Sequence, residues 1–390
     1  MVILTIFTFS SPKITFGQDM FNELPAEIKA FGNSVLVVTG KIAMRKAGVT
    51  SRLENLLIQK DITYYLFERV DPEPDIENIQ EALDFLQDHQ VASVLAIGGG
   101  SVIDVAKVAA GVYGHISKEK ISLREFLGHD ITLPGLPCIA IPTTAGTGSE
   151  VTKNSVILDS QTQTKSSIFR SPLIIPKGAI IDPVLMLSMP PKITAASGMD
   201  ALTQAVEAFV TRKANPFCDT LAIQAIEILG QNLQQAVADG TNIEVRERMA
   251  YGSLLSALAF SNSSLGAVHG LAHPIGALFH AAHGIVCALL LPHIMEFNKI
   301  TDPTKFAKIG AVLHPAVDIS QKSTTDLIEM GIEFIKDLLE QIQLPTRLRE
   351  LGVHETDIPR IVSDTKGSSL DNNPRTASPA DLTQILLKAL

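Results

Sequence analysis

The segment Val94-Leu-Ala-Ile-Gly-Gly-Gly-Ser101 changes from an apolar run to a glycine-rich turn, and a helical pattern follows over 102–110. A short apolar run is typical of a strand buried on both faces of a parallel sheet. Glycines let the backbone approach a ligand closely, and the start of a helix presents free N–H groups to an anion. This predicts a phosphate-binding turn. Asp104 falls in the first turn of the helix, where the dipole favours a carboxylate, and a contact with a ribose or nicotinamide amide is the alternative for it. A tight turn before a helix capped by Ser101 is the alternative without a ligand.

Short β-rich runs alternate with helical patterns on both sides of this segment, which is the signature of an α/β layer with a parallel sheet. Strands are predicted at 34–39, 63–67, 94–97 and 137–141, and helices at 51–59 and 75–89. From about Pro190, long helical patterns dominate: 195–211, 218–238 and 245–261. We therefore expect a nucleotide-binding α/β domain over residues 1–188 and an all-helical metal and substrate domain over residues 189–390.

A second polar turn, Pro142-Thr-Thr-Ala-Gly-Thr-Gly-Ser-Glu150, follows the strand predicted at 137–141. Open parallel sheets bind ligands at the carboxyl ends of their strands, where both turns are expected. Two such turns on neighbouring strands would form one cradle for a ligand. An ordinary solvent-exposed loop is the alternative.

Composition excludes several classes of protein. The chain has 390 residues with a net charge of −9, which argues against a nucleic-acid surface. Cys138, Cys218 and Cys287 are far apart and form no CxxC pair, so neither a disulfide framework nor a thiolate zinc site is expected.

The apolar N-terminus, residues 1–10, raises the question of a signal peptide. It lacks a basic region, and its β-branched and aromatic content favours an extended segment at a sheet edge. No apolar stretch is long and charge-free enough to predict a membrane span. We expect a cytoplasmic protein without a membrane partner.

The segment from His269 to His283 holds four of the ten histidines in the chain. His269 and His273 are four residues apart and share one face of a helix, and Asp200 and Gln204 have the same spacing. A carboxylate and imidazoles that converge from separate helices would form a divalent metal site with room for substrate. The alternative is a set of core or surface histidines that never meet.

The motifs Gly98-Gly-Gly-Ser-Val-Ile-Asp-Val-Ala-Lys107, Pro142–Glu150 and Gly198-Met-Asp-Ala-Leu-Thr203 occur in this order before the histidine segment. Together they resemble the iron-containing (group III) alcohol dehydrogenases over nearly the whole length. The resemblance implies a Rossmann-like domain and an all-α domain of dehydroquinate synthase-like architecture, with nicotinamide cofactor and metal in the cleft between them.

The resemblance also implies site residues. The cofactor-contacting positions are Gly40, Gly98, Gly99, Gly100, Ser101, Asp104, Thr143, Thr144, Ser149 and Lys165. The metal positions are Asp200, Gln204, His269 and His283, and three of these, Asp200, His269 and His283, are also catalytic. His273 matches a histidine near the nicotinamide and substrate that is assigned to proton relay.

Two positions depart from the family pattern. Family members typically carry a histidine where this chain has Gln204, a neutral and weaker ligand for Fe²⁺ or Zn²⁺, so metal affinity should fall. Many NAD-preferring relatives have an acidic residue near Gly40, whereas this chain continues with Lys41 and has Arg45 one helical turn later. These cations favour NADP, unless they are simply solvated surface charges.

The sequence thus predicts an NAD(P)-dependent enzyme that interconverts small alcohols with aldehydes or ketones by metal-assisted hydride transfer, as a homodimer or larger homo-oligomer. A polyol or glycerol dehydrogenase, or a maleylacetate reductase-type activity, is the alternative on the same fold. A nucleotide-binding relative without activity is the non-enzymatic alternative.

Overall fold

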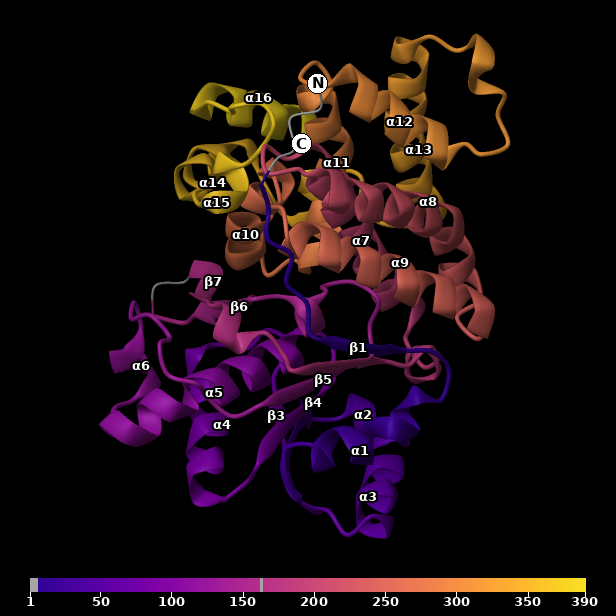
Figure 1. Cartoon of the computed structure of the whole chain (residues 1–390). Coiled ribbons are helices and arrows are strands. Elements are labelled where there is room, and N and C mark those ends of the chain that lie inside the picture. Colours follow the sequence, from indigo (N-terminus) through magenta and orange to yellow (C-terminus); the bar gives the residue numbers. More distant parts are fainter. Residues whose placement is uncertain (1–5, 162–163) are drawn as a thin grey trace. The chain divides into compact units, whose positions relative to one another are not determined.

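The computed structural model describes residues 6–161 and 164–390, without the side chains of residues 164–167. The chain divides into two compact units. One is the α/β unit Ser11–Met189, and the other is the helical unit Pro190–Leu390, to which residues 6–10 also belong (Figure 1).

The α/β unit is built on a parallel sheet. Its described strands pair in the order β1 (Lys13–Phe16), β8 (Gly178–Ile181), β5 (Cys138–Pro142), β4 (Ser93–Gly98), β2 (Ser34–Gly40) and β3 (Thr63–Val70). A separate antiparallel hairpin consists of β6 (Asn154–Asp159) and β7 (Thr164–Arg170). The strands predicted at 34–39, 63–67, 94–97 and 137–141 are confirmed as β2, β3, β4 and β5.

Helices cover both faces of the sheet (Figure 1). They are α1 (Leu24–Lys29), α2 (Ala43–Lys46), α3 (Val49–Gln59), α4 (Ile76–Asp88), α5 (Gly100–Glu119) and α6 (Leu123–Phe126). Short 3₁₀ helices lie at Met20–Glu23, Ser149–Val151, Pro172–Ile174 and Pro183–Met186.

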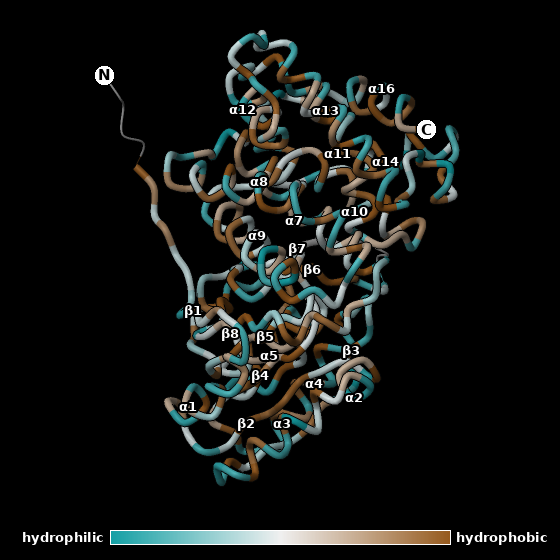
Figure 2. Tube along the Cα trace, turned by 90° about the vertical axis from the view of Figure 1, so that its right-hand side faces the viewer, coloured by the Kyte–Doolittle hydropathy of each residue, from teal (hydrophilic) through white to brown (hydrophobic). Residues whose placement is uncertain are grey.

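Side chains at alternate positions of the buried strands pack into two different hydrophobic cores. In β4, Val94 and Ala96 pack into the core under α4 and α5, whereas Leu95 and Ile97 pack into the core under α1 and α3. Successive strand side chains point to opposite faces, so a continuous apolar run is required where both faces are covered. Figure 2 shows the central strands mainly in the brown of hydrophobic residues.

The helical unit consists of α7 (Pro191–Val210), α8 (Pro216–Ala238), α9 (Ile243–Ser261), α10 (Ala267–Phe279), α11 (His283–Asn298), α12 (Pro303–Leu313), α13 (Thr324–Gln341), α14 (Ile358–Asp364), α15 (Ser368–Asp371) and α16 (Pro379–Ala389). Three further 3₁₀ helices lie at Ile319–Gln321, Leu348–Leu351 and Glu355–Asp357. Side-chain caps start several of the helices, as at Asn215, which accepts a hydrogen bond from the Cys218 N–H, and Ser323, which accepts one from the Asp326 N–H. No helix among the described residues has the length and apolar character needed to cross a membrane.

The edge strand begins later than the sequence predicts. Strand β1 does lie at the sheet edge, but it starts at Lys13, and residues 6–10 have no regular structure. The backbone of Ser10 instead bonds the Asn262 side chain of the helical unit, with N to Oδ1 at 2.6 Å and O to Nδ2 at 3.0 Å. Residues 1–5 of the predicted segment lie outside the described residues.

A buried group of charges fixes α5 to the segments after β5. The Lys107 ammonium is fully buried, 2.9 Å from Asp104 Oδ1, and donates to the Ser149 carbonyl at 3.1 Å and to Thr152 Oγ1 at 3.0 Å. Glu150 is buried beside this group, and burial raises the pKa of its carboxyl to about 7 although Lys107 opposes the rise.

We expect the Glu150 carboxyl to make the protein less stable as pH rises. The folded chain holds this proton up to about pH 7, whereas the unfolded chain releases it near pH 4.5. The stability from protonation is therefore present below pH 4.5 and is lost as pH rises through about 7. Between pH 5 and pH 8 the free energy of unfolding of wild type should fall by about 2–3 kcal/mol relative to Glu150→Gln.

Urea unfolding at both pH values measures this difference, with the exposed Glu81→Gln as the control for removal of a carboxylate. Parallel pH profiles for wild type and Glu150→Gln would contradict the prediction.

Candidate functional site

The glycine-rich turn lies at the carboxyl end of β4 and leads directly into α5. The helix begins at Gly100, so the first free N–H groups belong to the turn itself. A Cβ atom on Gly100 would come within 2.5 Å of Thr147 Oγ1, which explains why this position has no side chain. Free N–H groups at the start of a helix are a common binding site for a phosphate group.

The two predicted turns lie against each other. The Thr143 N–H donates to the Gly98 carbonyl at 3.0 Å, and the side chain of Thr144 lies next to Gly99. Their strands are adjacent in the sheet, with Gly98 in register with Pro142. The side chains of Thr143 and Ser149 are buried in this arrangement. The turns therefore form one cradle rather than two separate loops.

Two predicted cofactor residues are engaged within the protein. Ser101 lies inside the first turn of α5 and donates to the Pro72 carbonyl at 2.6 Å, so it is not the helix cap that the sequence suggests. Asp104 accepts from the Val156 N–H at 2.8 Å and pairs with Lys107. Its carboxylate is thus used to hold the β6–β7 hairpin. The side chain of Lys165 lies outside the described residues.

Gly40 ends β2, so it lies at the carboxyl ends of the strands, as the cradle does. The two cations that follow have acidic partners: Lys41 pairs with Asp71 at 2.5 Å and Arg45 with Glu68 at 2.6 Å. Both cations are about half exposed, so these pairs can open at small cost.

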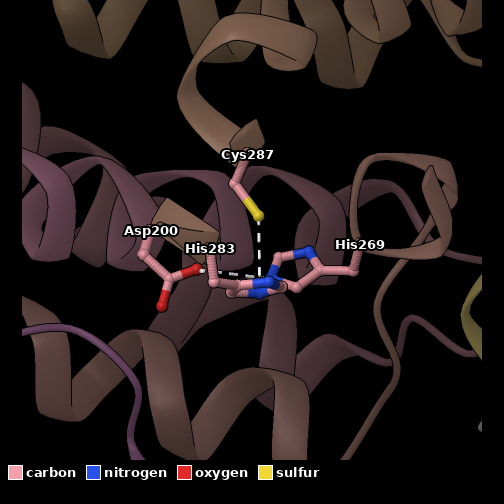
Figure 3. A group of neighbouring side chains, drawn as sticks. All are labelled: Asp200, His269, His283 and Cys287. Atoms are coloured by element: carbon pink, nitrogen blue, oxygen red, sulfur yellow. Dashed lines mark hydrogen bonds and ion pairs between the residues drawn. The ribbon is translucent and has the colours of Figure 1, made fainter. Parts of the chain in front are cut away.

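A second group of polar side chains lies inside the helical unit. Helix α7 contributes Asp200, α10 contributes His269, and α11 contributes His283 and Cys287 (Figure 3). One ligand atom from each of the four lies within 4.8 Å of the others. The sequence prediction that an aspartate and two histidines converge is therefore met in space, and the alternative of scattered histidines is not.

Glu207 orients this group. It lies on α7, and its Oε2 accepts from His269 Nδ1 at 2.6 Å while its Oε1 accepts from the Val268 N–H at 2.7 Å. This contact leaves His269 Nε2 facing Asp200 Oδ1 at 3.5 Å. A carboxylate behind a histidine is the usual support for a metal-binding imidazole.

The group fits a cation. Three buried atoms, Asp200 Oδ1, Gln204 Oε1 and His269 Nε2, have no hydrogen-bond partner within the described part of the chain. Buried polar atoms are normally paired, so three unpaired atoms on neighbouring side chains indicate a site for an ion. Burial opposes charge on Asp200, but His269 and His283 hold the pKa of its carboxyl below the ordinary value. A carboxylate is thus present to bind a cation.

The Gln204 side chain is turned toward Asp200. Its Nε2 donates to Asp200 Oδ2 at 2.9 Å, which leaves Oδ1 as the carboxylate oxygen that faces the two histidines. Gln204 therefore lies beside the group, and its amide nitrogen holds the Asp200 carboxylate.

The other two histidines of the segment differ in position. His273 stacks on His283, with ring centroids 5.5 Å apart, and is half-buried beside the group of candidate ligands. His280 ends α10 in the left-handed conformation and is exposed.

The chain matches two family models that together span it: "Iron-containing alcohol dehydrogenase" over residues 11–183 and "Fe-containing alcohol dehydrogenase family, C-terminal" over residues 194–390. The chain belongs to the iron-containing alcohol dehydrogenase family. It is 37% identical to a 1,3-propanediol dehydrogenase of Citrobacter freundii over 98% of this chain and 99% of the relative. It is 32% identical to an NAD-dependent methanol dehydrogenase of Bacillus methanolicus, over 98% and 99%.

The fold agrees with this assignment. A crystal structure of a 1,3-propanediol oxidoreductase superposes with a TM-score of 0.93 at 36% identity, covering 99% of this chain and all of that one. The chain is thus an oxidoreductase of the iron-containing alcohol dehydrogenase type, with the α/β and all-α architecture that the sequence predicts.

Sequence reasoning missed Glu207 and Cys287. The absence of a CxxC pair argues against a thiolate zinc site, but a single thiol that joins histidines needs no second cysteine. The signal for Cys287 is its four-residue spacing from His283, the same spacing that places His269 and His273 on one helix face. Glu207 follows Gln204 by three residues on α7, and only the contact with α10 reveals its role.

Gly284 lets α11 approach α7 closely enough to bring His283 to Asp200. A Cβ atom at this position would overlap the carbonyl oxygen of Ala196 and lie 3.3 Å from the Asp200 Cβ. The first obstacle is backbone, which cannot rotate away.

We expect Gly284→Ala to separate the metal-binding residues of this iron-type alcohol dehydrogenase. The extra methyl group should destabilise the protein by about 1–3 kcal/mol and reduce the metal retained after purification. Thermal unfolding and metal analysis measure both effects. Gly276→Ala is the matched control, because a Cβ there meets its nearest atom at an ordinary 3.4 Å. Full metal content in Gly284→Ala would show that the close helix contact is not needed.

Proposed function

We propose that this chain is an NAD(P)-dependent oxidoreductase that interconverts small alcohols and aldehydes. The observation that carries the proposal is the group of buried, unpaired ligand atoms on Asp200 and His269, together with the neighbouring His283. The glycine cradle of the α/β unit supplies the second requirement, a place for the pyrophosphate of a dinucleotide. Alcohol oxidation needs both functions, and each unit carries the residues for one of them.

Asp200, His269 and His283 would hold a divalent cation, Fe²⁺ or Zn²⁺. When bound there, the cation supplies Lewis acidity that favours the alkoxide form of a substrate alcohol. Glu207 keeps the His269 tautomer that exposes Nε2, and Gln204 keeps Asp200 Oδ1 toward the histidines. These two contacts prepare the ligands before a cation arrives, which reduces the cost of binding.

His273 is the candidate for proton transfer. Its ring lies one helical turn beyond His269 and stacks on His283, so it is adjacent to the ligands. It is half-buried, which gives it access to both the site and solvent. An imidazole titrates near neutral pH and can accept the alcohol proton and release it to water.

The cradle of Gly98, Gly99, Gly100, Thr143 and Thr144 would bind the cofactor phosphates. The absence of an acidic side chain at Gly40 removes the repulsion that excludes a 2′-phosphate, and the half-exposed Lys41 and Arg45 can leave Asp71 and Glu68 to bind one. We therefore infer that the enzyme accepts NADPH as well as NADH.

The substrate is inferred from the relatives. They are named for 1,3-propanediol and methanol, both small primary alcohols. The assembled ligand group argues against the alternative of a relative without activity, because such a protein would have no reason to keep buried ligand atoms unpaired.

We expect aldehyde-dependent oxidation of NADH or NADPH to stop on treatment with a chelator and to return on addition of Fe²⁺ or Zn²⁺. His283→Ala should lower kcat/KM by about 100-fold or more, because it removes a ligand rather than a supporting contact. The exposed neighbour His280→Ala is the matched control and should retain activity. Turnover that survives both metal removal and His283→Ala would overturn the proposed mechanism.

We expect the double variant Lys41→Ala/Arg45→Ala to raise the KM for NADPH by about tenfold, the effect of losing one charge-assisted contact. The KM for NADH should change less than about twofold, since NADH has no 2′-phosphate to lose a contact. Initial rates with both cofactors measure this, and Lys46→Ala on the same helix controls for removal of a surface cation. Equal effects on the KM values for NADH and NADPH would show that these cations do not bind the 2′-phosphate.

A further inference from the structure

The ligand group contains one side chain that the family pattern does not include. Cys287 follows His283 by one turn of α11, and its side chain is fully buried. The Sγ atom lies 3.5 Å from His283 Nε2. A thiol in this position faces a carboxylate and two imidazoles rather than an apolar core (Figure 3).

Gln204, at the position where a histidine ligand is expected, has a different role in this chain. Family members typically have a histidine where this chain has Gln204, and the amide nitrogen of Gln204 bonds Asp200 Oδ2. An amide nitrogen is a donor and does not bind a cation, and the remaining Gln204 Oε1, which has no hydrogen-bond partner among the described residues, is a neutral and weaker ligand than an imidazole. The helix face that would carry the third imidazole therefore mainly supports Asp200.

Three of the separations between ligand atoms are close to those around one tetrahedral ion, and all four atoms lie within 4.8 Å of one another. Bonds of about 2.0–2.1 Å to nitrogen or oxygen and about 2.3 Å to sulfur place neighbouring ligand atoms roughly 3.4–3.6 Å apart. The described separations are 3.5 Å for His269 Nε2 to Asp200 Oδ1, 3.8 Å for His283 Nε2 to Asp200 Oδ1, and 3.5 Å for Cys287 Sγ to His283 Nε2. These atoms already lie close to the spacing that a bound ion needs.

We propose that Cys287 is the fourth protein ligand of the metal centre and replaces the histidine that is missing at position 204. The centre is then Asp200, His269, His283 and Cys287, with Gln204 as a positioning residue for Asp200. This inference rests on the proposed function only in assuming that a divalent metal binds. It keeps the number of protein ligands at four, so a substrate oxygen would be a fifth ligand, as zinc permits.

A sulfur ligand changes which metal the site prefers. Thiolates are soft ligands that favour Zn²⁺ over Fe²⁺ in mixed nitrogen and sulfur sites. Binding forms a sulfur–metal bond and breaks the S–H bond, the thiol proton passes to solvent, and no electron is transferred. The chain therefore belongs to a family named for iron but has a donor set suited to zinc.

The test uses the full-length protein, depleted of metal with a chelator and reconstituted with Zn²⁺ or Co²⁺. X-ray absorption of the zinc form should show one sulfur neighbour at about 2.3 Å, and the cobalt form should show a thiolate-to-metal charge-transfer band. Cys287→Ser should lose both signals and bind Zn²⁺ more than about 100-fold more weakly, beyond the range typical of a supporting residue.

Two variants separate the roles of the ligand and its neighbour. Gln204→Ala should weaken Zn²⁺ binding by about 10–100-fold but keep the sulfur signals, as a positioning residue would. Gln204→His/Cys287→Ser should restore binding without sulfur and shift the preference from Zn²⁺ toward Fe²⁺. Cys138→Ser, at another buried cysteine, is the matched control and should keep every signal.

The outcomes distinguish this inference from the proposed function. A bound metal without a sulfur neighbour in wild type overturns the role of Cys287, even if the enzyme is active. Loss of metal in Gln204→Ala together with unchanged binding in Cys287→Ser assigns the fourth position to the Gln204 oxygen and also overturns it. Sulfur signals in a protein without alcohol dehydrogenase activity would support the ligand assignment while rejecting the function.

Discussion

The candidate metal centre of Asp200, His269, His283 and Cys287 depends on the two hydrogen bonds that Glu207 accepts from α10. One holds the Val268 N–H at the start of the helix, and the other holds His269 Nδ1. The same carboxylate therefore joins α7 to α10 and orients the His269 ring toward Asp200. A buried carboxylate is costly unless it is well bonded, and here its charge is balanced by the positive end of the helix and by the imidazole.

Close packing completes the arrangement from the other side. Gly284 allows α11 to lie against Ala196 on α7, and His283 and Cys287 extend from that helix toward Asp200. The α/β unit uses glycine in a similar way, because Gly100 allows Thr147 to close the cradle. In both units the chemistry depends on a place where the backbone must come unusually near another segment.

The sequence predicts the parts of this structure that lie on a single element. The apolar runs gave the strands, and the i, i+4 pairs gave the faces of α7 and α10. It fails where the partner lies on another element. Ser101 is predicted to cap α5, but it lies inside the first turn and its hydroxyl donates to the Pro72 carbonyl, and the Asp104 carboxylate holds the β6–β7 hairpin. Cys287 is recognised as a candidate ligand only when the structure places α10 and α7 beside it.

The four candidate ligands described above come from three helices of one unit, and the candidate cofactor cradle lies in the other. Free energy gained when a cation binds a folded site is added to the stability of the segment that forms the site. The cation would thus protect the helical unit from heat, and the dinucleotide would protect the α/β unit. The two units would then depend on two different cellular supplies, one of trace metal and one of coenzyme, to remain folded.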